Sequence, residues 1–249
     1  FTAVAADRNS ESLTRVQRVP SQSVGGTFQW SRPVGSSYTI VAGVDAREVR
    51  GASDELAFVQ NRPAFFVGAG GRERTAGVFA ENVFHIRSRL FVTAGARFDR
   101  WREFAALSTT RPVNPAQSSS TLQFPDRTET AFSPQFSFLY APSDRVSFTA
   151  LFTRAFRPAT LNELYRSFRV GDVVTLANEN LRAERQTGGE AGARFYHFNQ
   201  RLNSRVTIFW SEITRPVANV TLSVTPTLIT RQRQNLGRTR SRGWQNDVE

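Results

Sequence analysis

Apolar and polar residues alternate with a period of two along most of the chain, and no stretch sustains the 3.6-residue period of a helix. In residues 132–140, for example, phenylalanines and a tyrosine share one face, while serines and a glutamine occupy the other. Such alternation is typical of strands with one apolar and one polar face. The pattern predicts about ten strands, at residues 1–7, 14–31, 36–50, 72–86, 89–104, 130–140, 145–156, 186–198, 201–217 and 234–249.

The predicted connections alternate between short and long from the second strand onward. The short ones are residues 32–36, 87–88, 141–144 and 199–200, and the long ones are 51–71, 105–129, 157–185 and 218–233. Outer-membrane barrels have tight periplasmic turns at one end and long extracellular loops at the other. The sheet must close because an open edge in lipid leaves backbone N–H and C=O groups unpaired. We therefore predict an all-β fold, a transmembrane antiparallel up-and-down β-barrel.

A soluble all-β protein, such as a sandwich, propeller or solenoid, is the alternative. No repeat of 40–50 residues is present, which argues against a propeller. No run of about 18 apolar residues exists either, so a membrane-spanning helix is not expected. The chain starts in strand-like alternation without an initiator methionine and ends within a strand-like pattern, so we expect an internal fragment of a longer protein.

Composition changes this picture mainly through charge. The 32 basic residues are all arginine and the net charge is +11, which favours an anionic partner. Hydrophobic residues make up only 39%, yet there are 21 phenylalanines, as expected if apolar side chains cover one face of each strand. The absence of cysteine excludes a disulfide framework and thiolate zinc sites.

Residues 156–165, FRPATLNELY, resemble the segment F-R-[AP]-P-[ST]-L-x-E-L-Y of TonB-dependent outer-membrane receptors, where it leaves an upward barrel strand. A second family motif, N-P-x-L-x-P-E-x-S/T-x-x-x-E-x-G, opens the next strand. It is matched here by Asn178, Asn180, Leu181, Glu184, Thr187, Glu190 and Gly192. The chain departs from the family at Ala159, Glu179 and Ala183, where prolines are usual, and Pro158 stands one position before the first of these. The segment 237–247 also resembles a later strand motif, N-x-x-R-x-x-G-x-E, but it has Trp244 and Asn246 in place of the common aliphatic residue and Glu.

The resemblance implies part of a 22-stranded barrel, covering residues 1–249 as roughly strands 7 to 16, without the N-terminal plug, the TonB box or the final strands. It implies a bacterial outer-membrane receptor, not an enzyme, that uses TonB and its inner-membrane motor complex to import a scarce nutrient. A ferric siderophore or similar iron chelate is expected, and cobalamin, haem or an oligosaccharide would also suit the family. No cofactor is expected, and lipopolysaccharide and outer-membrane lipid are expected as neighbours.

The connection 157–185 holds the candidate ligand contacts, Arg157, Tyr165, Arg166, Phe168 and Arg169. Arginines beside aromatic rings can attract and stack on a flat anionic ligand. The same arginines can instead bind lipopolysaccharide phosphates or pair with nearby carboxylates. A second set, Glu163, Glu184, Arg185 and Glu190, is expected to clamp the loop above the pore, and solvated carboxylates are the alternative reading.

No catalytic or metal site is predicted. His85 and His197 have no metal-ligand spacing, and the cluster GAGG at 68–71 is interpreted as a flexible loop tip. A passive porin or adhesin barrel and a basic nucleic-acid-binding β protein are the other functional readings. Against nucleic acid, the arginines are scattered over many connections and no nucleic-acid-binding motif is present.

Overall fold

A computed structural model describes residues 2–4, 9, 11–198 and 201–249. Within these residues, eleven strands form one antiparallel sheet in which chain neighbours are largely sheet neighbours. They are β3 (Arg15–Arg18), β4 (Ser21–Val34), β5 (Tyr38–Val59), β6 (Arg62–Arg87), β7 (Leu90–Pro112), β8 (Ser120–Gln123), β9 (Arg127–Ser143), β10 (Val146–Arg157), β13 (Glu184–His197), β14 (Leu202–Thr214) and β17 (Arg238–Val248). The predicted all-β, up-and-down architecture is confirmed.

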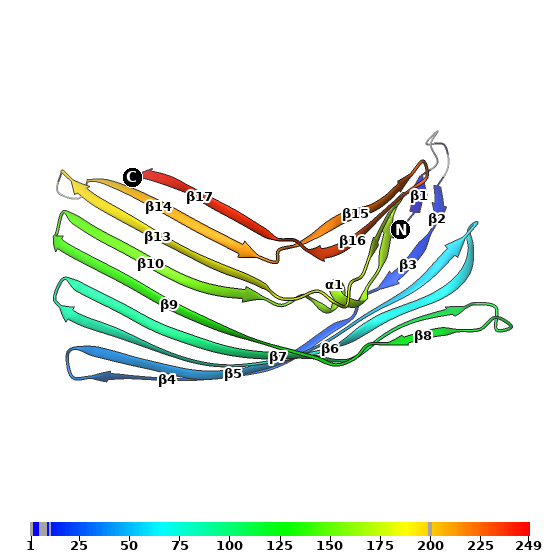
Figure 1. Cartoon of the computed structure of the whole chain (residues 1–249), viewed down its shortest axis with the longest axis horizontal. Coiled ribbons are helices and arrows are strands. Elements are labelled where there is room, and N and C mark those ends of the chain that lie inside the picture. The colour runs from blue at the N-terminus through cyan, green and yellow to red at the C-terminus, as the bar shows by residue number, and fades with distance from the viewer. Residues whose placement is uncertain (1, 5–8, 10, 199–200) are drawn as a thin grey trace.

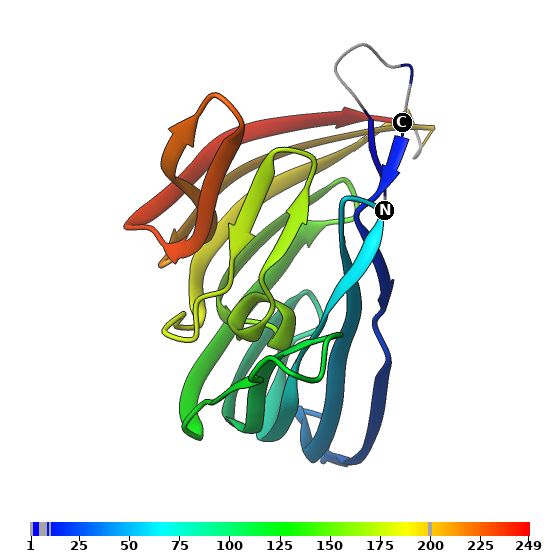
Figure 2. The ribbon, with the colours of Figure 1, turned by 90° about the vertical axis from the view of Figure 1, so that its right-hand side faces the viewer.

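The sheet curves strongly but does not close. Figure 1 shows the short turns at one end and the long connections at the other, and Figure 2 shows the curved wall from the long-connection end. Within the described residues, β3 and β4 pair only with β5 and form one edge of the wall, and β17 pairs only with β14 and forms the other. The short helix α1 (Leu161–Tyr165) lies on the concave side (Figures 1 and 2).

Four smaller strands and a hairpin complete the fold. β1 (Thr2–Val4) and β2 (Glu11–Leu13) pair with each other. β11 (Phe168–Val170), β12 (Val173–Leu176), β16 (Leu228–Asn235) and β15 (Val217–Thr225) form a separate sheet in that order. The β12–β16 pair is parallel and joins two successive long connections. No helix in the described residues is long and apolar enough to cross a membrane.

The prediction of a long loop at 51–71 is wrong. β5 and β6 pair continuously through this region and meet at a two-residue turn, Gln60–Asn61, where both residues have positive φ. Backbone pairing does not need an apolar face, so the ladder continues where the period-two signal fades. The GAGG cluster lies within β6 and is not a loop tip. A Cβ at Gly70 would lie 2.5 Å from the carbonyl oxygen of Gly51, so glycine permits the close approach of these strands.

Other predicted strand and loop boundaries also differ from those of the structure. The predicted strand 14–31 is divided into β3 and β4 at Pro20, whose missing N–H interrupts pairing. The predicted loop 105–129 contains the end of β7 and all of β8, and the predicted loop 218–233 is largely the β15–β16 hairpin. The predicted turn 199–200 lies outside the described residues, as does most of the predicted strand 1–7.

The two faces of the wall differ in chemistry. On the convex face many large apolar side chains are exposed, including Phe28, Val78, Phe98, Phe132 and Ile208. On the concave face Asp45, Arg97 and Asp99 form an ion-paired cluster, with Arg97 bound to both carboxylates at 2.6 Å. The buried apolar side chains gather instead near α1, between the long connection and the wall. An apolar outside and a polar inside are what a barrel in lipid requires.

Candidate functional site

The connection after β10 begins with a capped helix. Pro158 follows the last strand residue, and Thr160 then takes the N-cap position of α1. The Thr160 hydroxyl accepts a hydrogen bond from the Glu163 N–H at 3.2 Å, and the Glu163 carboxylate accepts one from the Thr160 N–H at 2.8 Å. This reciprocal pair is a capping box, which satisfies backbone donors that a helix of five residues cannot satisfy by itself.

Three buried side chains hold the connection against the wall. Leu164 is fully buried, Tyr165 is 2% exposed and Leu181 is 1% exposed. They pack together with Ala106 of β7, and the Tyr165 ring centroid lies 4.8 Å from that of Phe124. The connection is therefore anchored near both of its ends, on the inner side of the wall, and is not a free external loop.

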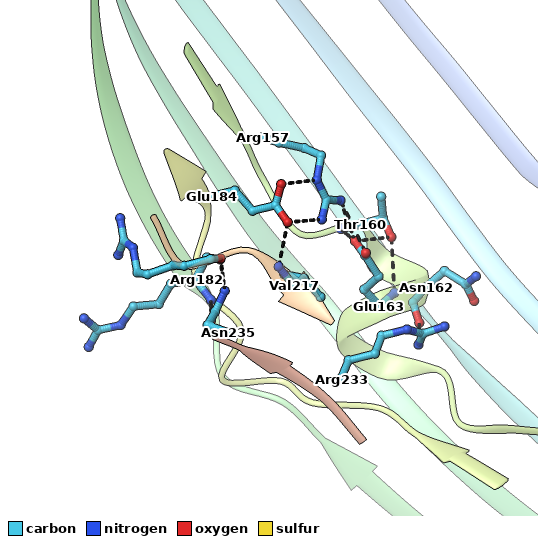
Figure 3. A network of polar contacts seen from close by, with 10 residues as sticks. Arg157, Thr160, Asn162, Glu163, Arg182, Glu184, Val217, Arg233 and Asn235 are labelled. Carbon is cyan, nitrogen blue, oxygen red and sulfur yellow. Dashed lines mark hydrogen bonds and ion pairs between the residues drawn. The ribbon is translucent and has the colours of Figure 1, made fainter. Parts of the chain in front are cut away.

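Arg157 links the two strand ends to the helix. Its guanidinium donates two hydrogen bonds of 2.9 Å to Glu184 and contacts both carboxylate oxygens of Glu163, at 3.0 and 3.3 Å (Figure 3). Glu184 also accepts a 2.7 Å bond from the Val217 N–H, so the first residue of β15 joins the same cluster. Two carboxylates around one guanidinium form a fixed planar arrangement that orients strand, helix and hairpin together.

The carboxylates of this cluster remain ionised near neutral pH. Burial alone would raise the pKa of Glu163, but hydrogen bonds from Thr160 and Arg157 outweigh it and place that pKa below its usual range. The hydrogen bonds from Arg157 lower the pKa of Glu184 despite its partial burial. The cluster is thus charged on both sides over the physiological range.

The second long connection is fastened to the first by side chain–backbone contacts. Arg233 of β16 donates a hydrogen bond of 3.1 Å to the carbonyl oxygen of Asn162 (Figure 3). It donates another of 3.3 Å to the carbonyl oxygen of Arg166. Asn235 accepts a 2.7 Å bond from the Arg182 N–H and donates a 2.9 Å bond to its carbonyl oxygen. Together with the parallel β12–β16 pairing, these contacts join the two connections into a single structural unit.

Arg166 and Arg233 lie over the same aromatic ring. Their guanidinium carbons are 5.3 Å and 5.2 Å from the centroid of Phe168. Arg166 also reaches Glu55 of β5 at 3.3 Å, and Arg15 of β3 binds that same carboxylate at 3.0 Å. Glu55 therefore ties residues more than a hundred positions apart to the inner wall.

Arg166 also lines a pocket of about 310 Å³ between α1 and the wall. The helix side of the pocket is formed by Thr160, Leu161 and Asn162, and the wall side is formed mostly by small residues, with Glu73 as a charged member. A concave, largely apolar space with a few polar groups is the usual form of a small-molecule site.

Arg185 belongs to a neighbouring aromatic cluster. Trp101 and Phe156 are stacked with centroids 4.9 Å apart, and the Arg185 guanidinium lies 5.4 Å from the first ring and 5.6 Å from the second. Arg185 also donates a 2.6 Å bond to the Thr130 carbonyl oxygen. Arg185 of β13 thus contacts β9 through this hydrogen bond, and β7 and β10 through the two rings.

A buried carboxyl lies behind the helix. Glu103 of β7 is 1% exposed, stands opposite Glu73 of β6, and has one carboxyl oxygen without a hydrogen-bond partner. Burial, partly offset by Arg127 and reinforced by Glu73, raises the pKa of Glu103 to about 7. The Tyr165 hydroxyl is also buried without a partner, and burial and Glu103 raise its pKa to about 12.

The structure thus brings together most, but not all, of the residues singled out from the sequence. Arg157, Glu163 and Glu184 form one ion-paired cluster, and the role of the two glutamates as a loop clamp stays a prediction. Glu190 lies in mid-strand on β13, outside that cluster. Tyr165 is a buried anchor, so a ligand contact would require the connection to move; that role stays a prediction.

Of the remaining candidates, Arg166 and Phe168 are adjacent, and Arg169 is exposed and lies 3.8 Å from Asp172. Sequence reasoning missed Arg15, Glu55 and Asn235. These lie far along the chain from the motif, and no local pattern points to them. The described residues contain no group of acidic or histidine side chains that could hold a metal ion.

Residues 2–248 match the protein family described as TonB dependent receptor-like, beta-barrel. Among solved structures, the copper transporter OprC is similar with a TM-score of 0.71 and 14% identity, over 94% of this chain and 36% of that one. The Serratia marcescens hemophore receptor HasR, solved with its hemophore and haem, gives a TM-score of 0.69 at 15% identity over 94% and 40% of the two chains.

The ferric yersiniabactin uptake receptor FyuA from Yersinia pestis gives a TM-score of 0.63 at 12% identity, over 95% of this chain and 34% of that one. The chain thus spans about a third to two fifths of the length of these structures. Among curated proteins, none is similar enough to count as a match.

Proposed function

Because the chain belongs to the TonB-dependent receptor β-barrel family, we propose that it forms part of the wall of an outer-membrane receptor that imports an anionic metal chelate. A ferric siderophore is the favoured cargo. Uptake would be driven by TonB and its inner-membrane motor through a plug segment, and this wall would supply roughly strands 7 to 16 of the barrel. Copper, haem and ferric yersiniabactin appear in the names of structures with this fold, which supports metal-containing cargo as a class.

One observation carries the proposal: the connection 158–183 is folded inward and fixed, with Arg166 at a pocket on the inner wall. Arg166 and Arg233 share the Phe168 ring, and only one of them has a carboxylate partner in the described residues. Arg233 instead donates to two backbone carbonyls. Two guanidiniums and an aromatic face, held in place before a ligand arrives, favour a flat or anionic ligand and lower the entropic cost of binding it.

In this proposal, the site makes the first contact with the imported chelate. An electropositive inner surface raises the local concentration of an anionic chelate and steers it toward the pore. Arg166 and Phe168 would then hold the chelate, and the exposed Arg169 would add attraction from the side of the connection. Arg157, Glu163 and Glu184 would keep the connection in place during binding.

The test uses the full-length receptor with Arg166 and Arg169 both changed to glutamine. Binding of an anionic ferric chelate should weaken at least tenfold, with little change for a neutral chelate of similar size, because only the anion loses its cation partners. Arg182→Gln, in the same connection, is the matched control, since the exposed Arg182 side chain forms no ion pair within the described residues. Unchanged affinity for the anionic chelate in the double variant would refute the site.

A second variant distinguishes ligand binding by Arg166 from a purely structural role of its bridge to the wall. Glu55→Gln also breaks the bridge to Arg166 but leaves both arginines intact. If anchoring of the connection alone explains the weaker chelate binding, Glu55→Gln will weaken binding as much as the double variant does. If the guanidiniums bind the chelate, the Glu55→Gln receptor will retain its affinity for the chelate. Energised uptake measured in cells with and without TonB then separates an active receptor from a passive pore.

A further inference from the structure

The pocket between α1 and the wall, here called the α1 pocket, is lined by two charged residues, Glu73 of β6 and Arg166. Glu73 stands opposite Val49 of β5, whereas Arg166 binds Glu55, which lies farther along the same strand toward the long connections. At about 3.3 Å per residue, these two levels of β5 are about 20 Å apart. The negative and the positive group therefore lie toward opposite ends of the pocket.

Between these ends the α1 pocket is lined mostly by apolar and small residues. Leu161 forms part of the helix side, and Gly51, Ala69 and Gly70 form part of the wall side. The Leu161 side chain lies 3.4 Å from where a Cβ of Gly51 would stand, so a larger residue at this position would fill the space beneath the helix. An apolar space of about 310 Å³ favours a hydrocarbon chain, because burial of apolar surface is favourable.

The end of the α1 pocket nearer the short turns is acidic. Directly opposite Glu73, on β7, stands a second carboxyl, Glu103. Glu103 is 1% exposed, and one of its oxygens has no hydrogen-bond partner in the described structure. Like charges directly opposite each other on neighbouring strands are destabilising, so a ligand cation at this end would relieve the repulsion.

The arginines near this end do not pair with Glu73. Arg127 of β9 stands on the other side of Glu103 and binds Glu129 at 3.3 Å. Arg47 of β5 stands opposite Thr75, the next residue of β6 on the same face. Within residues 11–198 and 201–249, Glu73 takes part in no ion pair, so its carboxylate is available to a ligand.

We propose that the α1 pocket binds a protonated amine at the end of an aliphatic chain, and that the imported cargo is an anionic chelate carrying such a chain. This inference rests on the proposed import, because it adds a second recognised group to the same cargo. Arg166 and Arg169 would hold the anionic head, the chain would lie along Leu161, and the ammonium would bind Glu73.

The charges of the α1 pocket select this kind of chain end. An ammonium donates charge-assisted hydrogen bonds to a carboxylate, and these are the stronger class of hydrogen bond. An acidic chain end would be repelled by Glu73 and Glu103, which disfavours a chelate with a second carboxylate there. A neutral polar end would lose its water without gaining an ion pair.

The test measures binding of two ferric tris-catecholate chelates to the full-length receptor in detergent. One chelate carries a pendant aminoalkyl chain, and the other carries the same chain with its amine acetylated, so the terminal positive charge is the difference between them. Glu73→Gln is the test variant. Glu81→Gln is the matched control, because Glu81 lies on the same strand and face, outside the α1 pocket, and forms no ion pair in the described part of the chain.

The unaltered receptor should bind the amine chelate about tenfold more tightly than the acetylated one, which is the usual size of a hydrogen-bonded contact to a charged group. Glu73→Gln should reduce this preference to less than about threefold, and Glu81→Gln should keep it. Ala69→Leu, which narrows the middle of the α1 pocket and keeps Glu73, should also reduce it. Equal affinity of the unaltered receptor for both chelates, or a full preference in Glu73→Gln, would overturn the inference.

The double variant with Arg166 and Arg169 changed to glutamine separates this inference from the proposed import. If the double variant binds both chelates more weakly while the unaltered receptor shows no preference for the amine, the import site stands and the amine site fails. If the double variant binds both as the unaltered receptor does while Glu73→Gln abolishes the preference, the amine site stands and the import site fails.

Discussion

Truncating Leu164 to alanine should loosen the inner connection without loosening the wall. Leu164 is fully buried between α1, Leu181 and the wall, so the change removes apolar contacts and leaves a cavity. Large-to-small changes at such positions cost about 2–5 kcal/mol. A loss of about 3 kcal/mol raises the population of the undocked connection roughly a hundredfold, because each 1.4 kcal/mol is a factor of ten.

Hydrogen exchange of the full-length receptor measures this population directly. Amides of residues 161–181 should exchange about a hundred times faster in Leu164→Ala, while amides of β10 and β13 keep their protection. Val170→Ala is the matched control, since Val170 is in the same connection but 57% exposed, and it should leave exchange unchanged. Equal acceleration in the two flanking strands would show that the connection does not open as its own unit and would refute this reasoning.

Two further outcomes concern charge. Burial raises the pKa of Glu103 to about 7. Protection of the inner connection against hydrogen exchange should therefore be greatest below the usual carboxyl pKa and decline as pH rises to about 7. Glu103→Gln should flatten that profile between pH 5 and 8, and an unchanged slope would disprove the assignment of the pH dependence to Glu103. Arg157→Gln should destabilise the connection by about 1–2 kcal/mol because it leaves two carboxylates without their shared cation. Adding Glu184→Gln should recover part of that loss in unfolding measurements, whereas strictly additive losses would argue against the pair.

The hairpin ends of the wall were predictable because two-residue periodicity persists wherever one face meets lipid. Phe132, Phe136 and Tyr140 are one example: they occupy alternate positions on one face of β9, and all three are exposed. The outer halves of β5 and β6 were not predictable in this way, since beyond the lipid both faces of a strand can be polar. Backbone hydrogen bonds between the strands stabilise that region, and they do not require apolar and polar side chains to alternate.

The candidate site was predictable only as far as the motif reached. Arg157, Glu163 and Glu184 lie within one recognisable segment, and the strand ends bring them together. Glu55 and Arg233 reach the site through the path of the folded connection. Contacts between residues 111 and 71 positions apart depend on that path, which no local pattern encodes.

The parallel pairing of β12 with β16 has a consequence for how such receptors diversify. Four residues of one connection are in register with four of the next, from Val173 opposite Ile229 to Leu176 opposite Gln232. A graft of either connection alone from a relative would bring new side chains but lose this register. Recombination that preserves function would therefore have to exchange both connections together with β13 and β14, which lie between them. The unit that is exchanged is then larger than either connection.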